Sequence, residues 1–350
     1  VDVSGSGRKG GFLSSLLDTV VGGVLQRIKW WRRGRRPATQ SVFGSPGMRL
    51  WFRRAVEATS PDILWVSYAF CDNIVDHRMT GSMLRINDSN DLSSLHTQVY
   101  LAAVKYFPHK LCPAAIPDFA ISEDFYRRLD IQASPDEFEI FDKYQQTIAI
   151  SPRECEIIRA NVRTTRVSYI PMTLEPRFVQ NTYCGPALQV MHGYPINLQG
   201  HHYFVTRVMP QVRRRANDFS LEVVGNGCNA VPPGDGVLLR GFVEDLRAVY
   251  ARARFLVMPV FGVTGQQIRI VEAMANGLPV VALRAAAEAS PIRHGFNGLV
   301  ADNAAEFAEH VLRLWREPET CRKMGAAARE TIATEFSRER LLSSLAAILS

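Results

Sequence analysis

Short apolar runs alternate with amphipathic segments along most of this chain, and the alternation is broken once near the middle. In the first half, the apolar runs 63–66, 83–86, 147–151 and 167–170 are separated by stretches of helical periodicity. The pattern restarts at 188–191, continues through 221–224, 237–239, 255–257 and 279–282, and ends in a helical tail over 304–349. Strands that alternate with helices predict parallel sheets with helices on both faces. The sequence therefore predicts an α/β protein with two Rossmann-like, doubly wound domains in series.

The predicted border between the two domains is the polar, proline-containing stretch over residues 175–185. We expect an N-terminal domain over residues 1–183 and a C-terminal domain over residues 184–350. The N-terminal domain is expected to lack its first strands, because roughly sixty residues precede the first convincing strand and the chain opens with Val1.

Basic residues are concentrated near the start of the chain, whose formal net charge is +7. Apolar residues recur at helical spacing over 12–28, and Trp30, Trp31 and several arginines follow directly. This combination is typical of a helix that lies on an anionic bilayer, and a core-facing helix with a solvated basic end is the alternative. We expect residues 12–36 to contact an anionic membrane surface, in a cytoplasmic protein that is peripheral on the inner face of the membrane. Nucleic acid is not an expected partner, because the basic block is one short run without a recognisable module.

Several classes of protein are disfavoured by motifs that the sequence lacks. The six cysteines are widely spaced with no C-x-x-C pair, which indicates free thiols in a reducing compartment and neither a zinc ribbon nor a disulfide framework. No G-x-G-x-x-G or G-x-x-x-x-G-K-[ST] pattern stands at a strand-to-helix turn, which weakens the dehydrogenase and P-loop alternatives. No D-x-D triplet is present, so we predict that no metal or other cofactor is required.

The most informative segment, residues 262–282, follows the apolar run 255–257. The small residues Gly262, Thr264 and Gly265 are expected to leave backbone N–H groups open at a helix N-terminus, where a diphosphate can bind. Arg269 lies one turn into this helix and can reach the same phosphates, and Glu272 can accept hydrogen bonds from a ribose diol. The alternative is an ordinary strand–helix–strand connection with capping glycines.

Residues 262–282, together with residues 239–243 and 295–300, resemble the donor domain of group 1 (family 4-like) glycosyltransferases. These enzymes share "G-T-G…K-x-x-E-A-M-A-x-G-x-P-V-V-A" followed by "G-x-N-G-x-L", and the resemblance covers roughly residues 185–336. It implies a GT-B fold, in which two Rossmann-like domains face a central cleft and the C-terminal one binds a nucleotide-sugar. It also implies that Glu272 meets the donor ribose, that Arg269 replaces the usual lysine at the diphosphate, and that Val243 lies in the loop at the nucleobase. The predicted substrate-binding residues are Gly193, Val243, Thr264, Gly265, Gln266, Arg269 and Glu272.

The predicted catalytic residue is Asp88. Residues 84–93 are similar to a "Y-R-x-S-D-x-L-S" element of the glucuronosyltransferase of xanthan assembly, an inverting GT-B enzyme whose aspartate base falls on Asp88. Retaining members of the group 1 family carry a second glutamate eight residues before the first, and Thr264 stands there in this chain, so inversion is favoured. A carboxylate at the end of a parallel strand is suited to general base catalysis. An N-cap or Asx turn is the alternative for Asp88, and His77, His96 or His109 is the alternative base.

The sequence therefore predicts a hexosyltransferase that moves a sugar from a nucleotide-sugar to a lipid-linked or cell-surface saccharide acceptor. A non-catalytic nucleotide-sugar binding protein of GT-B shape is one alternative. A sugar-nucleotide epimerase or a phosphorylase of the same shape is another.

Overall fold

The computed structural model describes residues 44–108, 115–176, 180–262 and 264–350. Within these ranges the chain forms two compact units, which are described one at a time. The first unit contains the described residues of 1–94, 133–148 and 157–168, and the second contains those of 95–132, 149–156 and 169–350. The predicted membrane segment, residues 12–36, lies outside the described residues, as do His109 and Cys112.

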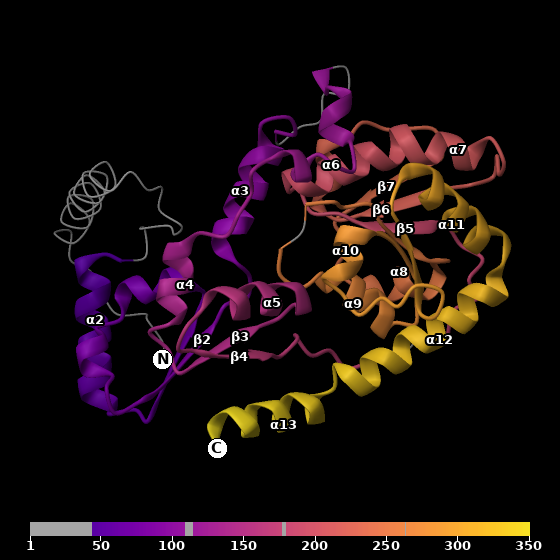
Figure 1. Cartoon of the computed structure of the whole chain (residues 1–350). Helices are drawn as coiled ribbons and strands as arrows, with labels where there is room; N and C mark the ends of the chain where they lie inside the picture. Colours follow the sequence, from indigo (N-terminus) through magenta and orange to yellow (C-terminus); the bar gives the residue numbers. More distant parts are fainter. Residues whose placement is uncertain (1–43, 109–114, 177–179, 263) are drawn as a thin grey trace, which may run out of the picture. The chain divides into compact units, whose positions relative to one another are not determined.

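The first unit is built on a sheet with the strand order β1-β2-β3-β4. Strands β2, β3 and β4 of this sheet are labelled in Figure 1. Strand β2 pairs in parallel with β1 on one side and with β3 on the other, so that Ile63 lies opposite Leu84 and Ile86 lies opposite Gln146. The strands are β1 (Ile63–Ser67), β2 (Leu84–Asp88), β3 (Gln146–Ala149) and β4 (Arg166–Tyr169), and the helices around them are α2 (Pro46–Thr59) and α4 (Pro135–Phe141), with 3-10 helices at Ala69–Ile74 and His77–Met79. Helix α5 (Pro152–Asn161) is divided between the units, since its residues 152–156 belong to the second unit and its residues 157–161 to the first.

The connection from β1 to β2 is held by a buried carboxylate. Asp72, which is 6% exposed, accepts hydrogen bonds from His77 Nε2 at 2.6 Å, from the Tyr144 hydroxyl at 2.8 Å and from Lys143. Burial alone would raise the pKa of Asp72, but the hydrogen bonds from His77, Lys143 and Tyr144 outweigh it and the pKa is lowered. His77 therefore has a structural partner in this connection.

A second buried carboxylate caps helix α3 (Ser93–Val104). Glu137 of α4 accepts the backbone N–H groups of Ser93 at 2.8 Å and of Ser94 at 3.1 Å, together with the Ser94 hydroxyl. In any α-helix the first N–H groups lie beyond the reach of intrahelical carbonyls, so this carboxylate satisfies donors at the helix N-terminus. Burial nevertheless raises the pKa of Glu137 to about 7.

The second unit is built on a parallel sheet of six strands in the order β10-β9-β8-β5-β6-β7. Its strands are β5 (Ala187–Val190), β6 (Leu221–Val224), β7 (Val237–Gly241), β8 (Leu256–Met258), β9 (Val280–Leu283) and β10 (Gly298–Ala301). Its helices are α6 (Pro195–Tyr203), α7 (Met209–Arg213), α8 (Leu246–Arg252), α9 (Ile268–Ala275), α10 (Arg284–Glu288), α11 (Ala304–Arg316), α12 (Pro318–Glu335) and α13 (Arg338–Leu349), and a π-helical turn (Phe204–Val208) joins α6 to α7.

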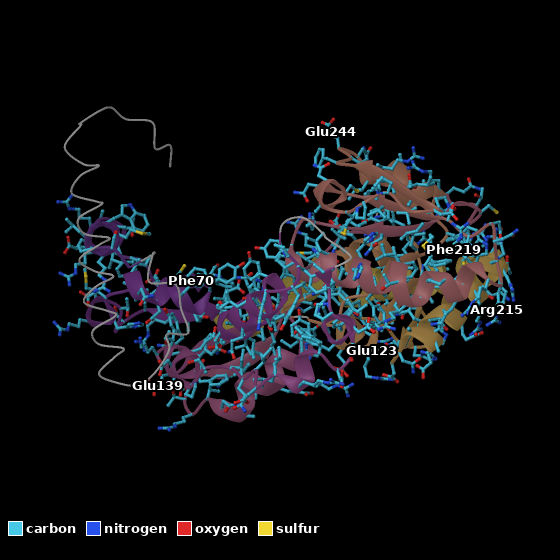
Figure 2. The ribbon with its side chains drawn as sticks, turned by 90° about the horizontal axis from the view of Figure 1, so that it is seen from above. Phe70, Glu123, Glu139, Arg215, Phe219 and Glu244 are labelled. Atoms are coloured by element: carbon cyan, nitrogen blue, oxygen red, sulfur yellow. The ribbon has the colours of Figure 1, made fainter. Side chains whose placement is uncertain are left out.

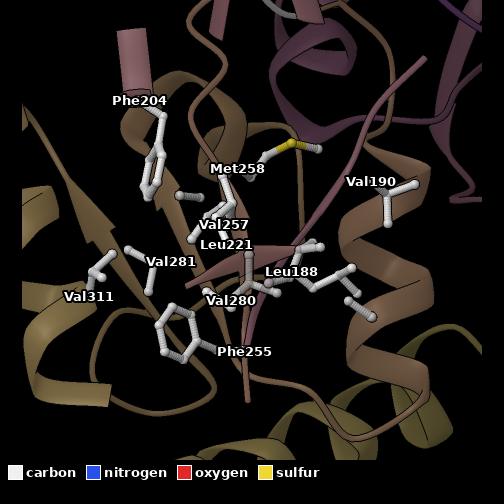
Figure 3. Packing of buried hydrophobic residues seen from close by; sticks show 14 of the residues in the cluster. Leu188, Val190, Phe204, Leu221, Phe255, Val257, Met258, Val280, Val281 and Val311 are labelled. Atoms are coloured by element: carbon white, nitrogen blue, oxygen red, sulfur yellow. The ribbon is translucent and has the colours of Figure 1, made fainter. Parts of the chain in front are cut away.

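Every residue of β5, β6, β8 and β9 is buried, because helices cover both faces of this sheet. Figure 3 shows how side chains from neighbouring strands, such as Leu188, Val257 and Val280, meet in the core with Phe204 and Phe255. The buried polar residues of these strands have partners inside the unit. Glu222 of β6, for example, accepts hydrogen bonds from Arg240 at 2.8 Å and from Arg252 at 2.6 Å.

Two contacts hold neighbouring segments, helix α12 and residues 115–132, against this unit. A Cβ atom at Gly325 of α12 would lie 2.0 Å from the carbonyl oxygen of Gly277, two residues after the end of α9, so only glycine allows α12 to pass there. The segment 115–132 is attached to the same unit through Glu123, whose carboxylate accepts the Tyr203 hydroxyl at 2.6 Å and the backbone N–H of Ala304 at 3.0 Å (Glu123 is labelled in Figure 2).

The predicted fold class is confirmed, since both sheets are parallel and Rossmann-like with helices between the strands. All nine predicted strands have counterparts within two residues, and the prediction omitted β10 and the short helix α4. The five described cysteines are free, and three of them, Cys155, Cys228 and Cys321, are buried. No helix among the described residues is both long enough and apolar enough to cross a membrane.

Candidate functional site

The carboxyl ends of β5, β6, β7 and β8 lie along one edge of the six-stranded sheet, because all its strands are parallel. The loops that follow these strands are bonded to one another. The N–H of Gly193, after β5, donates to the side-chain oxygen of Asn226, after β6, at 3.1 Å, and Gly225 N–H donates to the carbonyl of Gly241, at the end of β7, at 2.7 Å. In open parallel sheets ligands bind at this edge, so these loops are the walls of a candidate ligand site.

The turn between β8 and helix α9 adds a helix N-terminus to the same edge. Gly262 opens this turn, and a Cβ atom there would lie 2.4 Å from the ring of Tyr126. Gly265 has a φ of +62°, a left-handed conformation that favours glycine. Helix α9 then begins at Ile268 with no side-chain cap from Gln267. The predicted strand–turn–helix arrangement is therefore present at the carboxyl edge.

Arg269 lies in the first turn of α9 and points back to the end of β5. Its Nη1 donates to the carbonyl oxygen of Val190 at 3.1 Å, and its Nη2 donates to Gln267 Oε1 at 3.4 Å. Burial lowers the pKa of Arg269 to about 10, while the group remains a cation at neutral pH. The pKa of His192 is lowered by burial and then by the positive charge of Arg269, which places the guanidinium beside the loop that contains Gly193.

Glu272 lies one helical turn after Arg269. Burial raises its pKa, and this effect is opposed by a hydrogen bond from Tyr250 and by the charge of Arg269. The Tyr250 hydroxyl lies 3.5 Å from Glu272 Oε2. Glu272 is thus a half-buried carboxylate beside the cation of Arg269. Tyr250 of α8 also contacts Glu272, and the sequence analysis did not identify it.

Polar groups of Thr264, Gly265 and Gln266 have partners within this chain. The Gly265 N–H, expected to be open, donates to Glu154 Oε1 at 2.8 Å. Gln266 Oε1 accepts the backbone N–H of Met172 at 2.8 Å, and the Thr264 hydroxyl lies 2.9 Å from His96 Nδ1. The expectation of an open turn was therefore wrong for Gly265, since a buried carboxylate takes its N–H group.

Glu154 was missed by the sequence analysis, although a local signal exists. The tetrapeptide 151–154 has the S-x-x-E form of a helix capping box, which draws attention to a glutamate in the first turn of α5. The Ser151 hydroxyl does accept the Glu154 N–H at 3.2 Å, but the Glu154 carboxylate reaches the turn before α9.

The loop after β7 contains Val243, which is partly buried against the core of the second unit. The carbonyl of Gly241, at the end of β7, accepts a hydrogen bond from Gly225, which follows β6. The loop after β7 therefore starts beside the loop after β6. The predicted donor residues thus all belong to the second unit, on loops at one sheet edge or on α9.

Asp88 belongs to the first unit and is the last residue of β2. Burial raises its pKa, while hydrogen bonds from the Trp65 side chain and from the backbone of Asn90 act in the opposite direction. The bond from Asn90 forms the Asx turn that was the alternative interpretation of Asp88. Asp88 Oδ1 is buried and has no hydrogen-bond partner among the described residues.

A cavity of about 550 Å³ lies further along the second sheet, where β9 and β10 end. It is lined in part by Arg284, Glu288, His294, Asp302, Glu306 and His310. It contains none of the predicted donor residues. Within the described ranges, no three His, Cys, Asp or Glu side chains are grouped so that they could hold a metal ion.

Comparison with known proteins finds similarity in the part of the chain that contains this candidate site. Residues 189–317 match the family model of "Glycosyl transferases group 1", a range that includes Gly193, Val243, Arg269 and Glu272. This part of the chain is therefore similar to the group 1 glycosyltransferases.

Curated relatives match the chain over the same part. A Klebsiella pneumoniae sequence described as an "uncharacterized 44.6 kDa protein in cps region" is 23% identical over 163 residues, which are 43% of this chain and 42% of that protein. The GDP-mannose-dependent alpha-(1-6)-phosphatidylinositol monomannoside mannosyltransferase of Mycobacterium tuberculosis is 29% identical over 170 residues, 43% of this chain and 44% of the enzyme. The chain thus spans less than half the length of these curated relatives.

Solved structures match over most of the chain. The structure of TarM has a TM-score of 0.64 at 14% identity and covers 87% of this chain and 57% of TarM. The Anabaena protein HepE, in complex with UDP and glucose, has a TM-score of 0.58 at 13% identity and covers 90% of this chain and 84% of HepE. At this level of identity the likeness shows the fold, which is GT-B.

Proposed function

We propose that this protein is a glycosyltransferase that transfers a hexose from a nucleotide-sugar. The observation that carries the proposal is the pair Arg269 and Glu272 on α9, at the carboxyl edge of a parallel sheet, inside the part of the chain that matches group 1 glycosyltransferases. A partly buried cation beside a half-buried carboxylate is suited to a ligand that contains both phosphates and a sugar diol.

In this proposal each donor group has a partner in the second unit. Arg269, with the dipole of α9, binds the diphosphate, and Glu272 accepts hydrogen bonds from the ribose hydroxyls. The space beside Gly193 is open, since a Cβ atom there would meet nothing within 4 Å, and the phosphates are proposed to lie against the loop after β5 at this point. The backbone around Val243 binds the nucleobase. Arg269 supplies the positive charge that a metal ion would otherwise provide, so the reaction is proposed to need no metal.

Calorimetry with UDP and GDP and with their sugars tests the donor site. Arg269→Ala and Glu272→Ala should each weaken binding about tenfold or more, because a charge-assisted hydrogen bond contributes about 1.5–3 kcal/mol. Arg247→Ala is the matched control, since Arg247 is an exposed arginine of the same unit, paired with Asp245. Unchanged donor affinity in both site variants would exclude this site.

We further propose that the reaction inverts the anomeric configuration, with Asp88 as general base. The acceptor oxygen attacks the anomeric carbon as its proton passes to Asp88, and the nucleoside diphosphate leaves with the electrons of the broken bond. A raised pKa makes Asp88 a stronger base than an exposed aspartate, and Thr264 replaces the glutamate of retaining relatives.

Asp88→Asn keeps the size of the side chain and removes the proton acceptor. Turnover should fall about 10²–10⁴-fold, the usual contribution of a general base, with donor affinity unchanged. Asp62→Asn, on the exposed end of the loop before β1, is the control. Near-normal turnover in Asp88→Asn, or a product of retained configuration by NMR, would contradict this mechanism. Donor binding without any turnover would favour a non-catalytic binding protein.

We propose a saccharide acceptor carried by a lipid, with the protein held at the cytoplasmic face of an anionic membrane by residues 12–36. The basic, tryptophan-containing sequence supports this, and so does the relative named for a phosphatidylinositol monomannoside. Flotation with phosphatidylglycerol liposomes should show binding that weakens with salt. Replacing Trp30 and Trp31 by alanine and the adjacent arginines by glutamine should abolish it, and unchanged flotation would contradict the proposal.

A further inference from the structure

We infer that Glu154 occupies the anion position of the donor turn when no donor is bound, so that a donor phosphate must displace its carboxylate. The inference rests on the proposed function, because it concerns the turn before α9 as a phosphate site. It assigns to Glu154 a role in setting how strongly the site binds negatively charged donors.

The contact is well defined and lies inside the second unit. Glu154 is 3% exposed, and its Oε1 accepts the N–H of Gly265 at 2.8 Å. Gly265 stands three residues before α9 begins, in the left-handed conformation that turns its N–H toward the carboxylate. A backbone N–H directed out of a glycine turn at a helix N-terminus is the kind of group that binds phosphate oxygens in other proteins.

As an anion, the Glu154 carboxylate competes with a phosphate for the N–H group of Gly265. A helix N-terminus and the cation of Arg269 both attract anions, and the carboxylate is an anion that the chain itself supplies. A diphosphate at the same turn would meet a like charge at close range and would find the Gly265 N–H already taken. At about 5 Å and an effective dielectric constant near 20, repulsion between two unit charges is large enough to change affinity tenfold or more.

Donor binding is therefore an exchange of one anion for another. The Glu154 side chain turns away on its own rotatable bonds, and a phosphate oxygen accepts the Gly265 N–H in its place. A ligand without phosphates has no such competition, so the nucleoside alone should be indifferent to the charge of Glu154.

Calorimetry on the full chain at pH 7.5 tests this with inorganic pyrophosphate, UDP, GDP and uridine as probes. Glu154→Gln keeps the shape and the hydrogen-bond acceptor but removes the charge, and Glu154→Ala also frees the N–H. Both variants should bind pyrophosphate and the preferred nucleoside diphosphate about tenfold more tightly than the wild type. Uridine binding should be unchanged. Glu156→Gln, an exposed glutamate of the same helix, is the control and should behave as the wild type.

The outcomes separate this inference from the proposed function. Wild type and variants that bind the diphosphates with equal affinity would refute the role of Glu154 and leave the donor site intact. Weaker binding in a variant that unfolds at the wild-type temperature would show that Glu154 builds the turn, and would also refute the competition. If no protein binds UDP, GDP or pyrophosphate, the proposed donor site fails and this inference fails with it.

Discussion

Replacement of Arg269 by methionine should make the protein more stable while it removes donor binding. Arg269 is charged at neutral pH in a site that lowers its pKa from 12.5 to about 10, chiefly by burial. For a base, a folded-state pKa below the unfolded one means that the charged form is penalised in the folded state. The penalty is fully present below the folded-state pKa and disappears as the pH rises past the unfolded one, so it applies in full at pH 7.5.

The size of the effect follows from the same shift. The lowered pKa corresponds to about 3 kcal/mol, and loss of the hydrogen bond to the Val190 carbonyl offsets about 1 kcal/mol. Methionine retains most of the packing of the arginine stem. A net gain of about 2 kcal/mol raises the melting temperature by about 4 °C for a unit of this size.

Thermal unfolding followed by circular dichroism, with and without UDP or GDP, measures both parts. Arg269→Met should melt higher than wild type without ligand and should show no further rise with ligand. Arg247→Met, on the exposed face of the same unit, should change stability by less than about 0.5 kcal/mol. The double variant Arg269→Met/Glu272→Gln tests whether the remaining carboxylate masks the gain. A lower melting temperature in both the single and the double variant would refute the reasoning, since Arg269 would then stabilise the fold.

Two further predictions concern the fold. Because the folded-state pKa of Glu137 is raised to about 7, the folded state binds its proton more tightly than the unfolded state, so stability should fall between pH 4.5 and 7. In urea denaturation, Glu137→Gln should flatten the dependence of the free energy of unfolding on pH over this range. Glu139→Gln, at an exposed neighbour on α4, should leave that dependence as in the wild type. An unchanged dependence in Glu137→Gln would be inconsistent with this assignment. Gly325→Ala should destabilise the protein by about 1–3 kcal/mol, because its Cβ atom would meet the Gly277 carbonyl, and a melting temperature equal to that of the wild type would show that α12 can shift.

The strands were predictable because most of them are buried on both faces. A strand such as Leu221–Val224 is therefore a run of apolar residues with one charge, and it stands out from the helices around it. Strand β10 was omitted because Gly298 opens it directly after a glycine turn, a pattern that indicates a loop. Helix α4 has only seven residues, too few for helical periodicity to be recognised.

The site was predictable where its residues are neighbours in the sequence. Arg269 and Glu272 share one face of one short helix, so their spacing alone indicates a common role. Glu154 reaches Gly265 from 111 residues away, and His96 reaches Thr264 from 168 residues away. No local sequence pattern predicts such a pairing. The pairing depends on how residues 95–132 and the start of α5 pack against the six-stranded sheet.

The position of β5 in its sheet has a consequence for synthesis on the ribosome. β5 is the first strand of the six to be made, yet it lies between β6 and β8. β6 and β7 can pair beside it early, but its other edge stays open until residues 256–258 of β8 have emerged, several seconds later at about 5–20 residues per second. Ala187 and Leu188 are fully buried in the finished protein, so during that interval an apolar strand edge is unpaired. A chain that stalls between β7 and β8 would therefore be prone to aggregate through β5.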